Sequence, residues 1–189
     1  KNNKKRLEIM ETSTIHRDTT VAKKKSLPAA LWALTISAFA IGTTEFVIVG
    51  LLSTVASDLG TSLTSAGLLV SLYAIGVAIG APILTALTGK IPRKQLLMGI
   101  MLLFIIGNGL AAISPSFELL LLSRVVTGFA HGVFFSIGST IAASLVPKDK
   151  RATAISIMFA GLTVAIVTGV PLGTYIGQNF GWRATFIGV

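Results

Sequence analysis

Residues 117–145 read FELLLLSRVVTGFAHGVFFSIGSTIAASL, a run of 29 residues in which apolar side chains dominate. Its charged groups are Glu118 near the start and Arg124 farther in, together with the titratable His131. The hydrocarbon core of a bilayer is about 30 Å thick and needs about 20 helical residues for one crossing. This run therefore predicts a membrane-spanning helix that carries two polar groups, Arg124 and His131, inside the bilayer.

Similar runs recur along the rest of the chain, separated by short polar connections. The 189 residues are 52% hydrophobic and 12% charged, and their mean hydropathy is +0.82. This composition is far from that of a water-soluble domain, so it argues against a soluble enzyme and predicts an all-α membrane protein. The predicted spans are residues 29–52, 66–87, 96–113, 117–145 and 152–176, followed by a partial sixth span at 184–189.

Basic residues are distributed unevenly between the two ends of these spans. Residues 1–28 form a basic leader with eight Lys and Arg, and the connections Lys90–Lys94 and Lys148–Arg151 hold three each. Fourteen of the 16 basic residues therefore lie on one side, whereas the opposite connections contain only Arg183. Because short loops rich in Lys and Arg stay in the cytoplasm, we expect a cytoplasmic N-terminus and a multi-pass protein of the bacterial inner (plasma) membrane.

Two other interpretations of the sequence, nucleic-acid binding and a cleaved signal peptide, are less favourable. The basic pI of about 10.3 does not indicate nucleic-acid binding, because the basic residues abut apolar segments and no nucleic-acid motif accompanies them. Ala38-Phe39-Ala40 resembles a signal-peptidase site, but the apolar run continues for a further dozen residues. We therefore expect a retained first helix and no nucleic-acid partner.

Enzymatic chemistry also finds little support in the sequence. The chain has no cysteine, and no phosphate loop, metal-ligand cluster or cofactor fingerprint is found in its sequence. An intramembrane protease would need a Gly-x-Ser-Gly nucleophile and a histidine on another helix, but Ser136 and Ser139 lack that context and share a predicted helix with His131. We expect no enzymatic activity, no cofactor and no bound metal.

Two charged residues lie well inside the predicted spans, where each costs about 2.5–3.5 kcal/mol at a helix centre. At 1.5 Å per residue, Glu45 is about 22 Å and Arg124 about 20 Å from the cytoplasmic end of its span, so the two share a depth. His131 follows Arg124 by nearly two helical turns and lies on the same face. Glu45 and His131 are candidates for carrying protons and Arg124 for modulating them. The alternative is a structural Glu45–Arg124 ion pair, with His131 only bonded to a helix.

Glycines in three of the spans are spaced for close contact between helices. The pairs Gly76/Gly80 and Gly128/Gly132 each lie on one helix face, as do Gly169, Gly173 and Gly177 in the fifth span. For the second and fourth spans, packing alone explains the spacing. In the fifth span, Pro171 removes a backbone hydrogen bond within the glycine face and is expected to bend or loosen the helix.

Five motifs in the same order along the chain resemble the major facilitator superfamily, specifically its drug:proton antiporter branch and the arabinose efflux permease-like proteins. The opening signature corresponds to Gly42-Thr43-Thr44-Glu45-Phe46, and the family's arginine motif to Leu120, Arg124 and Gly128. The loop motif between the second and third spans is degenerate, since it keeps the basic positions and loses both glycines and the acid. The remaining motifs are found at Thr85–Lys94, Gly169–Thr174 and Gly181–Phe186.

The resemblance implies a fold and roles for these residues. The family fold has two six-helix halves with the substrate site between them, so this chain resembles the N-terminal half, a six-helix bundle truncated early in its sixth helix. Arg124 is implied in proton coupling. The basic connection is implied as a gating loop (Lys90, Arg93 and Lys94). The fifth-span motif (Gly169, Pro171 and Gly173) is implied as the antiporter motif, which distinguishes exporters from importers.

The function expected from these observations is proton-coupled export of a small organic solute, such as a sugar, a nucleoside or a drug-like molecule, by alternating access. The expected partners are the solute, protons, the lipid bilayer and a missing C-terminal half, with the proton gradient as the energy source. The alternative is a truncated membrane fragment that does not transport.

Overall fold

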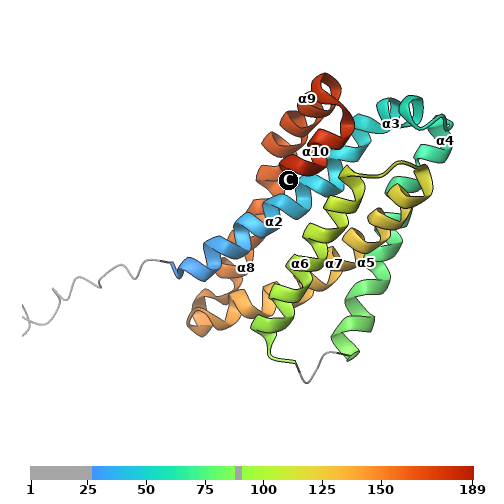
Figure 1. The fold of residues 1–189 in the computed structure, drawn as a ribbon. Helices are drawn as coiled ribbons and strands as arrows, with labels where there is room; N and C mark the ends of the chain where they lie inside the picture. Colours follow the sequence, from blue (N-terminus) through green and yellow to red (C-terminus); the bar gives the residue numbers. More distant parts are fainter. Residues whose placement is uncertain (1–26, 88–90) are drawn as a thin grey trace, which may run out of the picture.

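The computed structural model describes residues 27–87 and 91–189, and every regular element in these ranges is helical (Figure 1). Five helical stretches are long and apolar enough to cross a membrane. The elements are α2 (Ala29–Val47), the 3₁₀ helix η1 (Ile48–Leu51), α3 (Leu52–Asp58), α4 (Leu63–Ala66), α5 (Leu68–Leu87), α6 (Arg93–Ala112), α7 (Phe117–Ser144), the 3₁₀ helix η2 (Lys148–Lys150), α8 (Arg151–Val164), the π-helix η3 (Ala165–Gly169), α9 (Val170–Phe180) and α10 (Trp182–Gly188).

The first span is longer than predicted, because α2, η1 and α3 together form a helical stretch from Ala29 to Asp58. The prediction ended it at Leu52, where the apolar run gives way to polar residues. The helix instead ends at a glycine cap: Gly60 has φ of +62°, and the N–H of Thr61 donates to the carbonyl of Ala56 at 2.9 Å. This pattern is typical of a Schellman motif, and glycine accepts its left-handed conformation without a steric penalty.

The predicted glycine contacts are found between α5 and α7, which lie against each other along much of their length. A Cβ atom added at Gly76 would come within 2.6 Å of the Val125 carbonyl oxygen. One added at Gly128 would collide with the carbonyl oxygen of Tyr73, and one at Gly132 with that of Val77. The two backbones are therefore close enough that only glycine fits at these positions, as in small-residue packing of membrane helices.

A second close contact joins the first helix to the fifth. A Cβ atom at Gly161 of α8 would collide with the Thr35 carbonyl of α2, and one at Gly42 would lie 2.6 Å from Leu162 Cδ1. α6 packs against α7, so the arrangement brings α2, α5 and α6 around the long α7 (Figure 1). A buried core runs through it, formed mainly by Leu31, Leu34, Ile41, Phe104, Val133, Phe134 and Met158.

The short helix α10 is held at one end of the bundle by a polar cluster. Asp58 Oδ2 accepts hydrogen bonds from Trp182 Nε1 at 2.9 Å and from Arg183 Nη1 at 2.6 Å. The guanidinium of Arg183 also donates twice to the Ser114 carbonyl and stacks over the Trp182 ring. These contacts tie the end of α3 and the connection before α7 to the start of α10. α10 begins at Trp182, two residues earlier than the predicted sixth span.

Candidate functional site

Arg124 lies at the centre of the buried polar groups and is 1% exposed. All of its hydrogen bonds go to backbone carbonyls: Nε to Leu69 at 3.2 Å, Nη1 to Thr44 at 2.9 Å and Nη2 to Glu45 at 3.3 Å. The α-helical part of the first span ends at Val47, where η1 begins, and the last carbonyls of an α-helix lack an intrahelical donor. The guanidinium therefore binds α2 at a local irregularity and links it to α5 and α7.

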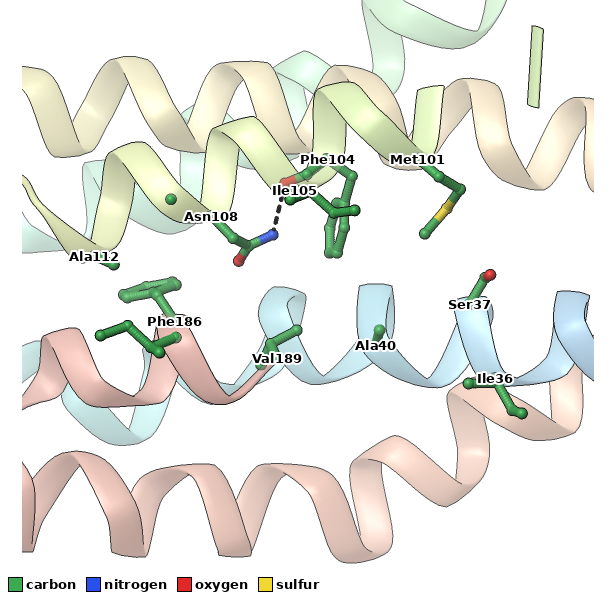
Figure 2. Close-up of a pocket in the computed structure, with 12 residues that line it drawn as sticks. Ile36, Ser37, Ala40, Met101, Phe104, Ile105, Asn108, Ala112, Phe186 and Val189 are labelled. Carbon is green, nitrogen blue, oxygen red and sulfur yellow. Dashed lines mark hydrogen bonds between the residues drawn. The ribbon is translucent and has the colours of Figure 1, made fainter. Parts of the chain in front are cut away.

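A second pair of buried polar side chains extends this network to α6. Thr44 Oγ1 donates to Asn108 Oδ1 at 3.0 Å, and Asn108 Nδ2 donates to the Phe104 carbonyl at 2.9 Å (Figure 2). This pair was not among the residues predicted from the sequence. Asn108 carried a usable signal, since an amide inside an apolar run is itself an intramembrane polar group. The hydrogen bonds of Arg124, Thr44 and Asn108 thus join the helices α2, α5, α6 and α7 at one level of the bundle.

The side chain of Glu45 turns toward His131. Its Oε2 atom lies 3.7 Å from His131 Nδ1, and these side chains are 26% and 12% exposed. In the part of the chain that the structure describes, Asp58 and Arg183 form an ion pair, and Glu45 and His131 would form a second one if the imidazole were protonated. The hypothesis of a Glu45–Arg124 ion pair is therefore wrong for this structure, because the guanidinium binds the Glu45 carbonyl instead of its carboxylate. The prediction that Glu45 and Arg124 lie at a similar level in their helices agrees with the structure, since the guanidinium reaches the Glu45 carbonyl.

Tyr73 of α5 completes the cluster and was missed by the sequence analysis. It is 2% exposed, its hydroxyl oxygen lies 3.0 Å from His131 Nδ1, and its ring lies 4.1 Å from the guanidinium carbon of Arg124. The helical spacing held a signal, because Tyr73 and Gly76 are three residues apart and so face the same way. Arg124 and Tyr73 are thus buried, whereas the neighbouring Glu45 and His131 are partly exposed.

The fifth helix contains the distortion that Pro171 predicts. The five residues Ala165–Gly169 form a π-helix directly between α8 and α9. Proline has no backbone N–H and its ring collides with the carbonyl four residues earlier, so regular α-helical bonding is lost at this point. The glycines of the motif face α2: a Cβ atom at Gly169 would collide with Thr43 Oγ1, and one at Gly173 would lie 2.8 Å from Val47 Cγ2. The π-helix therefore packs beside the segment of α2 that carries Glu45.

We expect Pro171→Ala to leave the amount of folded protein near normal, because Pro171 itself is exposed. Alanine restores the N–H and favours an α-helix by about 3 kcal/mol, so the π-helix is expected to relax toward regular geometry and stiffen the fifth helix. In a complete transporter this should impair solute export, measured as initial rate at matched expression. Unchanged export together with reduced expression would show instead that the distortion serves folding alone.

The predicted gating residues are not part of this cluster. Arg93 and Lys94 form the exposed first turn of α6, and neither has an acidic partner among the described residues. Asn108, which bonds Thr44, lies 15 residues farther along α6, or about 22 Å along the helix axis. Lys90 lies outside the described residues.

Two cavities lie beside α2, and neither contains a titratable side chain. The larger, 430 Å³, lies between α2, α6 and α10 and is lined mainly by apolar groups such as Ile36, Met101 and Phe186 (Figure 2). The smaller, 270 Å³, lies between α2 and the fifth helix and includes Thr43 and Gly169. Both adjoin Val189, the last residue of the chain. Their linings provide room for apolar groups and no site for proton transfer.

Comparison with known proteins relates the whole bundle to membrane transporters. The family model described as Major Facilitator Superfamily matches residues 34–189. The chain is 63% identical over 168 residues to the MFS-type transporter YtbD of Bacillus subtilis, a match that covers 89% of the chain and 42% of the relative. It is 48% identical over 157 residues to the inner membrane transport protein YdhP of Escherichia coli K12 (83% and 40%), and 41% identical over 160 residues to a chloramphenicol resistance protein of Streptomyces lividans (85% and 41%). The chain therefore spans about two fifths of the length of these curated relatives.

Proposed function

Because this chain belongs to the major facilitator superfamily, we propose that it is the N-terminal half of a proton-coupled exporter that moves a small organic solute across the bacterial inner membrane. The relatives are membrane transporters, and this supports transport over the intramembrane-protease alternative. Transport would proceed by alternating access, in which this bundle rocks against a second, C-terminal bundle. The proton gradient would supply the energy, without a cofactor.

The observation that carries the proposal is the Glu45–His131 pair above the buried Arg124. Titratable groups are costly inside a bilayer, and within a membrane transporter such groups are typical of a proton pathway. A proton on Glu45 or His131 changes the local charge beside a guanidinium that holds α2 through its backbone. A change of charge at this point therefore acts directly on the contact between α2 and α5, which is what coupling to a rocking motion requires.

Small organic solutes are proposed because the relatives are transporters, one of them a chloramphenicol resistance protein. Export of a drug-like, sugar or nucleoside solute is consistent with this relationship, and the substrate site would be completed by the C-terminal half. The competing proposal is a fragment that stays in the membrane without transporting. The two differ in whether this bundle takes part in solute transport when a C-terminal half is present.

The test uses everted membrane vesicles that contain the complete transporter, with a pH-sensitive dye as the readout. The proposal predicts that adding a transported solute dissipates the proton gradient, and that a protonophore stops solute accumulation. Solutes from the three classes would be tested in turn, with vesicles that lack the transporter as the control. Solute accumulation that is insensitive to the protonophore would contradict proton coupling. Equal activity of the 189-residue chain alone would contradict the need for a second half.

The proposed orientation places the N-terminus and both basic connections in the cytoplasm, because fourteen basic residues lie on that side. The chain has no cysteine, so a single cysteine replacing Gly89 is the only labelling site. We expect an impermeant maleimide to label it in everted vesicles and not in intact cells, whereas a cysteine replacing the exposed Thr64 should show the opposite pattern. Labelling of the Gly89→Cys chain from outside intact cells would reverse the orientation.

A further inference from the structure

Tyr73 is the one buried titratable side chain of the cluster to which the proposed function gives no role. It lies on α5, and its ring is placed by the close contact between α5 and α7, where its backbone carbonyl touches Gly128. Its ring face is covered by the Arg124 guanidinium at 4.1 Å. Its hydroxyl reaches His131 Nδ1 at 3.0 Å. Tyr73 thus lies between the fixed arginine and the histidine that faces Glu45.

His131 Nδ1 has two possible hydrogen-bond partners. It would accept a hydrogen bond from one of them, the Tyr73 hydroxyl, and donate one to the other, the Glu45 carboxylate. The Tyr73 hydroxyl lies 3.0 Å away and Glu45 Oε2 lies 3.7 Å away. Among the described residues, Nδ1 is the single hydrogen-bond partner of the Tyr73 hydroxyl. A buried tyrosine hydroxyl usually donates its proton, so Nδ1 must offer a lone pair here, which leaves the ring proton on Nε2. Glu45 Oε2 lies beyond hydrogen-bond distance, and in its carboxylate form it would bind Nδ1 only if that nitrogen were protonated.

We propose that Tyr73 is a positioning residue of the proton site: its hydroxyl donates to Nδ1 of neutral His131 and holds the ring in the tautomer with its proton on Nε2. The inference rests on the proposed function for its role in transport. A hydrogen bond that only the neutral ring can accept favours the neutral ring, so Tyr73 opposes protonation of His131. Protonation becomes easier when Tyr73 is displaced, because Nδ1–H can then donate to the Glu45 carboxylate.

The transfer itself is balanced within the pair. A proton held by Glu45 Oε2 passes to Nδ1, so that an O–H bond breaks, an N–H bond forms, and a neutral pair becomes a carboxylate and an imidazolium. The 3.7 Å separation must shorten for this step, either through a change of side-chain rotamer or through an approach of α2 to α7. The titratable and charged groups that face His131 are Glu45 of α2, Tyr73 of α5 and Arg124 of its own helix, while the apolar ring of Phe135 packs against the imidazole. Tyr73 therefore occupies Nδ1 until the hydroxyl and the Glu45 carboxyl group change places beside it.

The tautomer of His131 can be measured directly in the 189-residue chain. The chain has two histidines, so His16→Gln leaves His131 as the single ¹⁵N-histidine signal in phosphatidylglycerol–phosphatidylcholine vesicles. Solid-state NMR distinguishes a protonated ring nitrogen from an unprotonated one. We expect Nε2–H with an unprotonated Nδ1 at neutral pH. An Nδ1–H tautomer in the chain with native Tyr73 would overturn the inference, whatever any Tyr73 variant does.

Tyr73→Phe tests the consequence, because it keeps the ring over Arg124 and removes only the hydroxyl. We expect the His131 titration midpoint to move up by about half to one pH unit, the size of one neutral hydrogen bond. The matched control is Tyr175→Phe, since Tyr175 is 61% exposed and touches none of these groups, and it should leave the midpoint unchanged. An unchanged midpoint in folded Tyr73→Phe would contradict the positioning role.

The transport readout separates this inference from the proposed function. In the complete transporter, Tyr73→Phe should move the pH of half-maximal export in the same direction and leave the apparent solute affinity unchanged. Export that is independent of the proton gradient, together with the expected NMR shift, would reject the proposed function and keep the hydrogen-bond assignment. A proton-coupled exporter with no shift in either measurement would reject the role of Tyr73 alone.

Discussion

Replacing Glu45 by glutamine is expected to abolish solute accumulation driven by the proton gradient while solute binding is retained. Glutamine keeps the shape and most of the hydrogen bonding of the acid, but its amide does not take up or release a proton at the pH values at which a carboxyl group titrates. Its amide would still lie beside His131, and the Glu45 carbonyl that binds Arg124 is a backbone atom that the change leaves in place. The loss should therefore fall on coupling and leave folding intact. The measurement is active accumulation and equilibrium solute binding in everted vesicles at matched expression.

Glu118→Gln is the matched control for this variant, since Glu118 is an exposed acid in the first turn of α7, the helix that also carries Arg124 and His131. We expect it to transport like the native protein. Native-level, protonophore-sensitive export in Glu45→Gln would contradict the assignment. His131 would then be the remaining titratable candidate, and its glutamine variant would be the next to measure.

Gly128→Leu is expected to prevent folding of the bundle, the largest effect on stability that the structure predicts. The added Cβ atom would collide with the Tyr73 carbonyl, and neither backbone can move aside without separating α5 from α7. Overpacking with side chains alone costs about 1–3 kcal/mol, and a clash between backbones exceeds that range. Leucine is also a better helix former than glycine, so loss of helix propensity cannot explain a defect. The yield of monodisperse protein after detergent extraction and its thermal melting would measure the effect.

Gly99→Leu serves as the control, because a Cβ atom at Gly99 in α6 has nothing within 4 Å. We expect near-normal yield and melting temperature for this chain. Equal behaviour of the two leucine variants would mean that α5 and α7 are not in backbone contact. Arg124 and Tyr73 would then be arranged differently in the site, because the contact between α5 and α7 is what places Tyr73.

The sequence predicted the spans, the glycine contacts and the common depth of Glu45 and Arg124. Each depends on properties that act locally or along one helix, namely hydrophobic length, four-residue spacing and rise per residue. The distortion near Pro171 was also predictable, because proline changes the bonding of its own helix.

The partners of the polar groups were beyond these local rules. Arg124 binds backbone carbonyls of α2 and α5, which carry no sequence signal, so the sequence offered the Glu45 carboxylate as the alternative partner of Arg124 and did not indicate the carbonyls. The position of Tyr73 under Arg124 depends on how α5 is rotated against α7. The end of the first helix was predicted too early, because hydropathy marks only the apolar run that ends at Leu52. The helical stretch continues beyond that run to the cap at Gly60.

An infrared titration of the 189-residue chain in lipid vesicles tests most directly whether the Glu45–His131 pair takes up protons. Glu45 is the acid placed well inside a span, so a protonated carboxyl band that is lost in Glu45→Gln belongs to it. We expect this band to titrate over the pH range in which the transporter works, and we expect His131→Gln to move its midpoint. A Glu45 carboxyl whose protonation stays constant across that range would contradict the claim.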